Sequence, residues 1–380
     1  RLRRRPTYLS VPYDDWEVEA DPNARAVLGR SVERSRHPAP QQLARIVKEV
    51  RAAKRPALVL GGDIDADGLF DEATTLAAAL DAPTWAAPSL HRLPFPNRHP
   101  LFQGVLPAGI TSVADALAGH DLVLVLGAPV FRYHEYQPGE YLREGTRLVQ
   151  VTDDAEAAAR APFGEAVVTE PGAVIRELLK ALPASPAGAR DYTVPAAPAE
   201  GTGAALHPEQ VFAALRDTQQ ADTSYVVEST ATNGSWWRQM DLRRGGSYFF
   251  PASGGLGFGI PAAVGVALAA PDRPVVGVIG DGSANYGITG LWTAAQQRLP
   301  VTYVLLRNGT YGALQWFGEL LGATDAPGTT IPGLDFTRIA EGYGVPATQA
   351  RDLDQLRALL DEAPAGPRLI QVDTVPTSPA

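Results

Sequence analysis

Two polar turns in the second half of the sequence carry side chains that suit metal binding. Asp281 follows the apolar run "PVVGVIG", and Asn308 follows the next apolar run, "VTYVLLR". The spacing fits one strand–helix–strand crossover, so both side chains are expected at one edge of a parallel sheet. With the Thr310 carbonyl they form an incomplete oxygen shell, which suits Mg²⁺ completed by water and phosphate oxygens. Asp-Gly and Asn-Gly are also common turn dipeptides, so a purely structural role stays open.

The surrounding sequence predicts an α/β protein with two parallel sheets. Short Val- and Leu-rich runs alternate with helical patterns before residue 190, and the same rhythm returns after it. Runs that are apolar throughout predict strands covered by helices on both faces, and the alternation predicts right-handed crossovers. Between the halves, "ALPASPAGARDYTVPAAPAEGTGA" is rich in Pro, Ala and Gly and predicts an interdomain linker.

Length and composition limit the class of protein. A chain of 380 residues should hold two domains. Its 45% apolar and 20% charged residues are typical of a soluble globular protein, and no apolar run approaches the ~18 residues of a membrane span. A net charge of -9 argues against nucleic-acid binding, despite the basic opening "RLRRRP". The absence of Cys excludes disulfides and thiolate metal sites and suits the cytoplasm.

Longer motifs carry a resemblance to a known family. The GDG motif followed by Asn one crossover later resembles the thiamine diphosphate signature. The stretches "YLSVPYDDW", "HRLPFPNRHPLFQGVLPAGI", "LGAPVFRYHEYQPG", "SGGLGFGIPAAVGVALA" and "NGTYGALQWF" resemble thiamine diphosphate-dependent 2-oxo acid decarboxylases, benzoylformate decarboxylases in particular. The resemblance implies thiamine diphosphate and Mg²⁺ as cofactors. The family usually ends the signature with Asn-Asn, whereas this chain has Arg307 before Asn308.

The resemblance also implies a domain order. Residues 1–23 resemble the tail of a pyrimidine-binding domain and its linker, residues 24–185 a Rossmann-like middle domain, residues 186–206 a linker, and residues 207–380 the domain that binds diphosphate and Mg²⁺. The sequence shows no counterpart of the pyrimidine-binding domain itself, so we expect the chain alone to be inactive. A fragment, a split enzyme and a degenerate remnant all stay open. A complete site further implies a homo-oligomer, a dimer or tetramer, whose cofactor lies between subunits.

Cofactor roles follow from the same resemblance. The implied metal ligands are Asp281, Asn308 and the Thr310 carbonyl. The implied cofactor-binding residues are Thr230, Gly254, Leu256, Asp281, Gly282, Ser283, Asn308, Thr310 and Tyr311. Leu256 resembles the apolar wedge that holds the cofactor bent, although in isolation it would suggest one buried Leu in a flexible connection. Ala231 stands where the family has Ser, so one hydrogen bond is expected to be missing.

The substrate side is expected to combine one His with an apolar wall. His134 follows a buried strand and coincides with the active-site His of the family's middle domain, so we expect it to donate or accept a proton near the substrate. The implied substrate-pocket residues are Phe250, Ala313, Leu314 and Phe317. They would favour an aromatic substrate over pyruvate. The alternative is that "YGALQWFGEL" is an amphipathic helix that buries its apolar side.

The resemblance thus implies decarboxylation of benzoylformate to benzaldehyde and CO₂, with this chain supplying the Mg²⁺–diphosphate half of the site. Two alternatives stay open. One is an acetolactate synthase or oxidase relative with flavin in its middle domain, although "LVLGGDIDADG" lacks the dinucleotide fingerprint. The other is a truncated protein that binds thiamine diphosphate without catalysis. In each case the expected partner is a small molecule, without nucleic acid or membrane.

Overall fold

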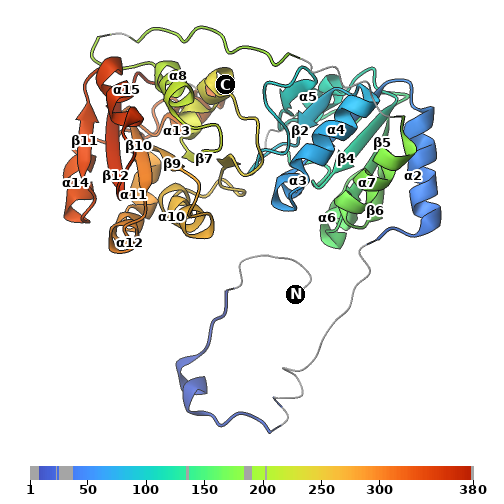
Figure 1. Ribbon diagram of the computed structural model, residues 1–380, viewed down its shortest axis with the longest axis horizontal. Coiled ribbons are helices and arrows are strands. Elements are labelled where there is room, and N and C mark those ends of the chain that lie inside the picture. Colours follow the sequence, from blue (N-terminus) through green and yellow to red (C-terminus); the bar gives the residue numbers. More distant parts are fainter. Residues whose placement is uncertain are drawn as a thin grey trace. The chain divides into compact units, whose positions relative to one another are not determined.

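The computed structural model describes residues 8–22, 24, 37–133, 137–183, 191–201 and 203–377. The chain divides into two compact units, Arg1–His37 and Pro38–Ala380. Among the described residues of the first unit, one short 3₁₀ helix is formed, η1 (Tyr13–Glu17). Both sheets belong to the second unit (Figure 1). No helix in the described part of the chain has the length and apolar character needed to cross a bilayer.

The first sheet has six strands in the order β3-β2-β1-β4-β5-β6, all paired in parallel. Its strands are β1 (Pro56–Leu60), β2 (Thr84–Ala86), β3 (Phe102–Val105), β4 (Leu122–Leu126), β5 (Arg147–Thr152) and β6 (Glu165–Val168). The helices of this half are α2 (Pro40–Ala52), α3 (Gly62–Ala66), α4 (Phe70–Leu80), α5 (Ile110–Ala116), α6 (Ala155–Arg160) and α7 (Pro171–Ala181).

The second sheet also has six parallel strands, in the order β11-β12-β10-β9-β7-β8. Its strands are β7 (Ser224–Glu228), β8 (Tyr248–Phe249), β9 (Val275–Gly280), β10 (Val301–Arg307), β11 (Ala347–Ala350) and β12 (Arg368–Asp373). Its helices are α8 (Pro208–Thr218), η2 (Thr230–Thr232), α9 (Asn233–Gln239), α10 (Gly259–Ala269), α11 (Asp281–Gly287), α12 (Gly290–Gln296), α13 (Gly312–Leu320), α14 (Phe336–Gly342) and α15 (Leu353–Asp361). The predicted α/β class with two parallel sheets is confirmed.

Alternating strand residues enter different cores on the two faces of each sheet. In β9, Val276 and Val278 pack with helices α8, α9 and α15, whereas Val275 and Ile279 pack with α10, α12 and α14. The first sheet behaves in the same way, with Leu58 and Leu60 in one core and the intervening Val59 in the other. Two apolar faces explain why the strands have apolar sequences throughout, because successive side chains point to opposite sides.

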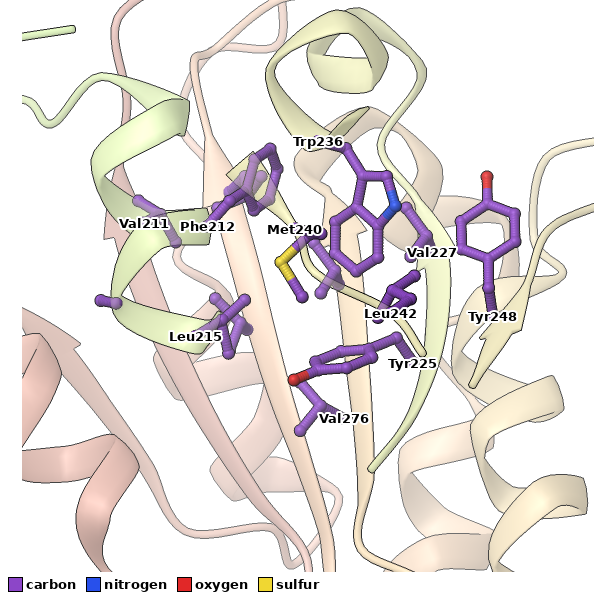
Figure 2. Close-up of a cluster of buried hydrophobic side chains, with 14 of the residues drawn as sticks. Val211, Phe212, Leu215, Tyr225, Val227, Trp236, Met240, Leu242, Tyr248 and Val276 are labelled. Carbon is purple, nitrogen blue, oxygen red and sulfur yellow. The ribbon is translucent and has the colours of Figure 1, made fainter. Parts of the chain in front are cut away.

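The core beneath α8 and α9 is built around an aromatic cluster (Figure 2). The fully buried Trp236 lies edge-on to Phe212 and Tyr225, with ring centroids 5.3 and 5.4 Å away. Its centroid is 5.9 Å from that of Tyr248 in the edge strand β8. These contacts bury large rings at favourable offset geometries, so they fix the position of β8 beside β7.

The predicted linker lacks helix and strand but is held by hydrogen bonds where the structure describes it. The Thr193 N–H donates to the Arg98 carbonyl at 2.9 Å. The N–H groups of Ala199 and Gly201 donate to side chains at the start of α8, each at 3.0 Å. Residues 191–201 are therefore an anchored extended segment. The three boundaries between the four segments inferred from the sequence stay predictions.

Direct contacts join the two sheet-bearing halves of the second unit. Asp65, at the end of α3, accepts the Gly246 N–H at 2.6 Å and pairs with Arg92 at 2.7 Å. The Arg92 guanidinium in turn lies 4.6 Å from the ring centroid of Phe249 in β8. Phe250 donates its N–H to the His91 carbonyl at 3.0 Å. The first half thus fixes the segment that follows β8, which leads to the candidate site.

Candidate functional site

The second sheet has its topological switch point between β7 and β9. From β7 the chain moves to the edge strand β8 through α9, and it returns through α10 to β9 on the other side of β7. Helices α9 and α10 cover opposite faces, because their buried residues belong to different cores. Ligands of open parallel sheets bind at such a point, outside the carboxyl ends of the strands. Thr230 follows β7 and Asp281 follows β9 at this edge.

Asp281 is buried and ties two of the predicted elements together. One carboxylate oxygen accepts the Gly309 N–H at 2.7 Å, and the other accepts the Gly282 N–H at 2.9 Å. Burial raises the pKa of this carboxyl above its ordinary value, and both N–H donors act in the opposite direction. The desolvated carboxylate gains from a nearby cation, since a positive charge favours its ionised form.

The predicted turn at Asp281 is wrong in one respect, since Asp281 is the first residue of α11 and β9 passes directly into that helix. Glycine at position 282 is explained by the space available rather than by a turn. A side chain there would begin 2.7 Å from the Tyr311 ring. The turn at Asn308 is confirmed, with Gly309 at φ 72° in the left-handed region. The Asn308 Oδ1 accepts from the Thr310 N–H and hydroxyl at 2.9 and 3.1 Å.

The donor set fits a cation that also binds an anionic ligand. Asp281 and the Asn308–Thr310 turn are joined by the Asp281–Gly309 hydrogen bond, so the predicted carboxylate, carboxamide and carbonyl oxygens share one edge. Among the described residues, no group of three or more His, Cys, Asp and Glu is placed to hold a metal ion. A cation held by these oxygens would complete its shell with oxygens from water or a ligand, as Mg²⁺ does with phosphates.

The remaining predicted diphosphate contacts surround these residues. Helix α13 packs on η2, so Gly312 lies against Ala231, the neighbour of Thr230. The Ala231 carbonyl accepts the Thr377 hydroxyl at 2.9 Å. Ser283 is buried in the first turn of α11. The structure thus brings Thr230, Gly282, Ser283 and Tyr311 to the same edge as Asp281. Their roles stay predictions.

The glycine-rich segment before α10 also reaches this edge. Gly254 has φ 70° and Gly257 has φ 96°, so both adopt the left-handed region that favours glycine. Gly257 packs on the end of α11, where a side chain at Gly287 would begin 2.6 Å from the Gly257 carbonyl oxygen. Leu256 is 37% exposed. An exposed Leu in a backbone-packed segment does not support the alternative of a simple buried Leu.

The apolar residues predicted for the substrate wall fall into two groups. Phe250 is partly buried and stacks on Tyr248, with ring centroids 6.3 Å apart. Helix α13 buries none of its residues, and Leu314 and Phe317 are 57% and 45% exposed. The alternative of a helix that buries its apolar side is therefore wrong for this structure. Ala313 lies in the same first turn of α13. His134 lies outside the described residues.

Sequence reasoning missed two charged features of this edge. Glu228 ends β7 with no exposed surface, and its carboxylate accepts the N–H groups of Phe258 and Gly259. Arg307 forms a bidentate pair with Asp373, at 2.8 and 3.2 Å, beside a cavity of about 350 Å³ that Asp281 and Asn308 also line. A Glu at the end of an apolar run was the available signal for Glu228. The Arg–Asp pair joins β10 to β12 and could not be read from either strand alone.

Comparison with known proteins agrees with this geometry. Residues 43–178 match the central domain of thiamine pyrophosphate enzymes, and residues 230–373 match their C-terminal TPP binding domain. A benzoylformate decarboxylase of Pseudomonas aeruginosa is 48% identical over 98% of this chain and 71% of the relative. The chain belongs to the thiamine pyrophosphate enzyme family. The predicted resemblance is thereby confirmed, and so are the cofactors that this family uses, thiamine diphosphate with Mg²⁺.

Solved structures of other members extend the match. A thiamine diphosphate-dependent 4-hydroxybenzoylformate decarboxylase of Rhodococcus jostii RHA1 aligns with a TM-score of 0.89 at 48% identity, over 96% of this chain and 69% of that one. A benzoylformate decarboxylase of Polynucleobacter necessarius aligns with a TM-score of 0.86 at 34% identity, with the same coverage. The chain thus spans about 70% of these thiamine pyrophosphate enzymes.

Proposed function

We propose that this chain supplies the Mg²⁺–diphosphate half of a decarboxylase site for an aromatic 2-oxo acid such as benzoylformate or its 4-hydroxy derivative. The observation that carries the proposal is the 2.7 Å hydrogen bond from the Gly309 N–H to Asp281. It joins the buried Asp281 carboxylate after β9 to the Asn308–Thr310 turn after β10. Membership of the thiamine pyrophosphate enzymes and 48% identity to a benzoylformate decarboxylase support the reaction class.

In this proposal the protein contributes binding and orientation. Asp281, Asn308 and the Thr310 carbonyl would hold Mg²⁺, while Thr230, Ser283 and Tyr311 would contact the diphosphate. When bound, the thiazolium ring of thiamine diphosphate takes up the electron pair that stays behind on the substrate carbon as CO₂ leaves. Leu256 and the Gly254 carbonyl would set the bend of the cofactor, because an apolar wedge between its two rings excludes the extended shape. His134 is our candidate for proton transfer to or from the substrate.

The preference for an aromatic substrate rests on the apolar residues near the site. Leu314 and Phe317 present exposed side chains from α13, and Phe250 follows β8 at the same edge of the sheet. An aromatic ring buries more apolar surface against such side chains than the methyl group of pyruvate, so its binding free energy is more favourable. We therefore expect a Phe317→Ala variant to raise the KM for benzoylformate in the active enzyme, with little change for pyruvate.

The flavin-binding alternative is disfavoured by the first sheet. Its topological switch point lies between β1 and β4, where a dinucleotide would bind in a parallel sheet. There Gly61 donates its N–H to the Leu126 carbonyl at 2.9 Å, and a side chain at Gly61 would begin 2.0 Å from the Gly127 carbonyl oxygen. The two exit loops touch through their backbones, which favours a cofactor in the second sheet only.

The proposal is tested by supplying the region that the chain does not span. The N-terminal part of the Pseudomonas aeruginosa relative, added in trans with Mg²⁺ and thiamine diphosphate, should allow CO₂ release from benzoylformate that neither part gives alone. Mg²⁺-dependent binding of thiamine diphosphate without CO₂ release from any 2-oxo acid would instead favour a binding protein without catalysis. A yellow chain with flavin absorbance would favour the acetolactate synthase relative.

A homo-oligomer and a cytoplasmic location complete the proposal. The oligomer is supported by the exposed apolar side chains of α12 and α13, among them Trp292 and Leu320. Such side chains are more often covered by another surface than left in water. The absence of Cys suits a reducing compartment. Sedimentation of the chain at several concentrations measures the first of these, and a dimer or tetramer is expected.

A further inference from the structure

The buried Glu228 has no role in the cofactor contacts considered so far. It is the last residue of β7 and has no exposed surface, and two residues later the chain reaches Thr230. A buried carboxylate is costly unless its oxygens are hydrogen-bonded, so its presence calls for a specific explanation. Apolar residues at the same place would satisfy the core without that cost.

Both oxygens of Glu228 bind one short stretch of backbone. Oε1 accepts the Phe258 N–H at 3.1 Å, and Oε2 accepts the Gly259 N–H at 2.7 Å. These N–H groups belong to the start of α10, where helix geometry leaves donors without partners and the helix dipole favours a negative charge. Burial raises the pKa of Glu228, and the N–H donors of this stretch oppose that rise.

The backbone that Glu228 binds is the exit of the glycine-rich segment that carries Leu256. Gly259 has no side chain, and an added one would begin 2.4 Å from the Ile279 Cδ1 and 2.8 Å from the Glu228 Cβ, so these two side chains occupy the space that this glycine leaves. The entrance of the segment is held separately, since the Arg132 guanidinium donates to the Ala252 carbonyl at 2.7 Å. Between these two anchors, Leu256 remains 37% exposed.

We propose that Glu228 is a positioning residue that fixes Leu256 relative to Thr230. Its side chain anchors the exit of the glycine-rich segment to the end of β7, and η2, which carries Thr230, begins directly after that strand end. Through its main chain Glu228 sets the start of η2, and through its side chain it sets the start of α10. Glu228 thus links the part of the site that holds the diphosphate to the part that bends the cofactor. The inference rests on the proposed function, because it assigns the segment its role at the cofactor.

This role predicts different effects on two ligands. Pyrophosphate needs only the Mg²⁺–diphosphate contacts of Asp281 and the Asn308–Thr310 turn, whereas thiamine diphosphate also needs Leu256 in place. In Glu228→Gln one acceptor oxygen becomes an NH₂ group, so at least one of the two backbone N–H groups loses its partner. The segment should loosen while the diphosphate contacts stay intact.

The experiment measures binding of Mg²⁺–pyrophosphate and Mg²⁺–thiamine diphosphate to the full chain by titration calorimetry. We expect Glu228→Gln to weaken thiamine diphosphate about tenfold, while pyrophosphate affinity stays within about twofold, on the scale of one lost buried hydrogen bond. The exposed Glu341→Gln is the matched control and should change neither affinity. Equal weakening of both ligands, or no weakening of either, would overturn the role of Glu228.

A second variant keeps the inference testable if Glu228→Gln does not fold. Arg132 is exposed and anchors the other end of the segment, so Arg132→Ala should fold and show the same selective loss of thiamine diphosphate binding. No selective loss in Arg132→Ala would count against positioning by this segment. Failure of the proposed function has a different signature, because the unaltered chain would then bind neither ligand in a Mg²⁺-dependent way.

Discussion

The two sheets of the second unit share one architecture but differ in the loops at their switch points. In each, glycine and then Asp stand at the exit of a buried strand. Asp63 follows β1 after Gly61 and Gly62, and Asp281 follows Gly280, the last residue of β9. In the first sheet the exit loops of β1 and β4 touch through Gly61 and Gly127. In the second, the corresponding exits carry Thr230 and Asp281. In our proposal the same fold serves as a scaffold in one half and as a binding edge in the other, according to the side chains at the exits.

The largest expected effect comes from removing the acidic residue at the binding edge. Asp281→Ala should weaken Mg²⁺-dependent pyrophosphate binding by at least about 100-fold. Mutating a residue that only supports a metal ligand already lowers metal affinity about 10–100-fold, and Asp281 is proposed to bind the metal directly. The equivalent change in the first sheet, Asp63→Ala, is the control and should leave that affinity unchanged. Calorimetric titration at fixed Mg²⁺ measures both. If the two variants behaved alike, the contrast between the switch points would be wrong.

The closed switch point should respond through stability. In Gly61→Ala the new methyl group meets the Gly127 carbonyl, so the exit loops must separate at a cost of about 1–3 kcal/mol in the free energy of unfolding. In Gly282→Ala the methyl group meets the side chains of Tyr311 and Ile331 rather than backbone, so this variant should lose less stability than Gly61→Ala and should lower pyrophosphate affinity. Urea unfolding of both variants, with the unaltered chain alongside, gives the comparison. An unchanged free energy of unfolding in Gly61→Ala would show that the exit loops of β1 and β4 can separate without cost.

A smaller effect is expected at Arg307, where the family usually has Asn. Its ion pair with Asp373 is partly exposed, so Arg307→Asn should cost at most about 1 kcal/mol of stability. The same change removes a positive charge beside the proposed Mg²⁺ ligands and leaves Asp373 without its cation, so Mg²⁺ affinity should rise. Titration with Mg²⁺ and pyrophosphate at two salt concentrations tests this. A fall in affinity would mean that Arg307 itself contacts the anion.

The smallest effect concerns the pH dependence of the first switch point. His91 packs on Gly62, and burial, followed by Arg132 and Arg92, lowers its pKa, while Asp65 acts in the opposite direction. Between its lowered pKa and the ordinary value of 6.5, the unfolded chain binds a proton that the folded chain does not. Stability should therefore fall as the pH drops below about 6.5.

His91→Gln tests this dependence by removing the titrating group. The free energy of unfolding, measured in urea at several values between pH 5 and 7, should change less steeply with pH in the variant than in the unaltered chain. Identical slopes for His91→Gln and the unaltered chain would contradict a neutral His91 in the fold.

The sequence was informative where chemistry and periodicity coincide. Apolar runs predicted both parallel sheets, because strands buried on two faces must be apolar throughout. The relation of Asp281 to Asn308 followed from the length of one crossover. The ion pair between Arg307 and Asp373 and the contact of Gly61 with Gly127 could not be predicted, since each depends on which non-consecutive strands become neighbours. For Glu228 the sequence offered a Glu at the end of an apolar run, but not the helix start that its carboxylate binds. His134 remains a sequence-based prediction.

The bond between the Thr377 hydroxyl and the Ala231 carbonyl has a practical consequence. A residue near the last described position of the chain is tied to the turn that is proposed to receive the diphosphate. Affinity tags or truncations at the carboxyl terminus would disturb this hydrogen bond and with it the position of that turn. Low cofactor occupancy in such preparations would then reflect the altered terminus rather than the protein itself. For ligand titrations, the tag therefore belongs at the amino-terminal end.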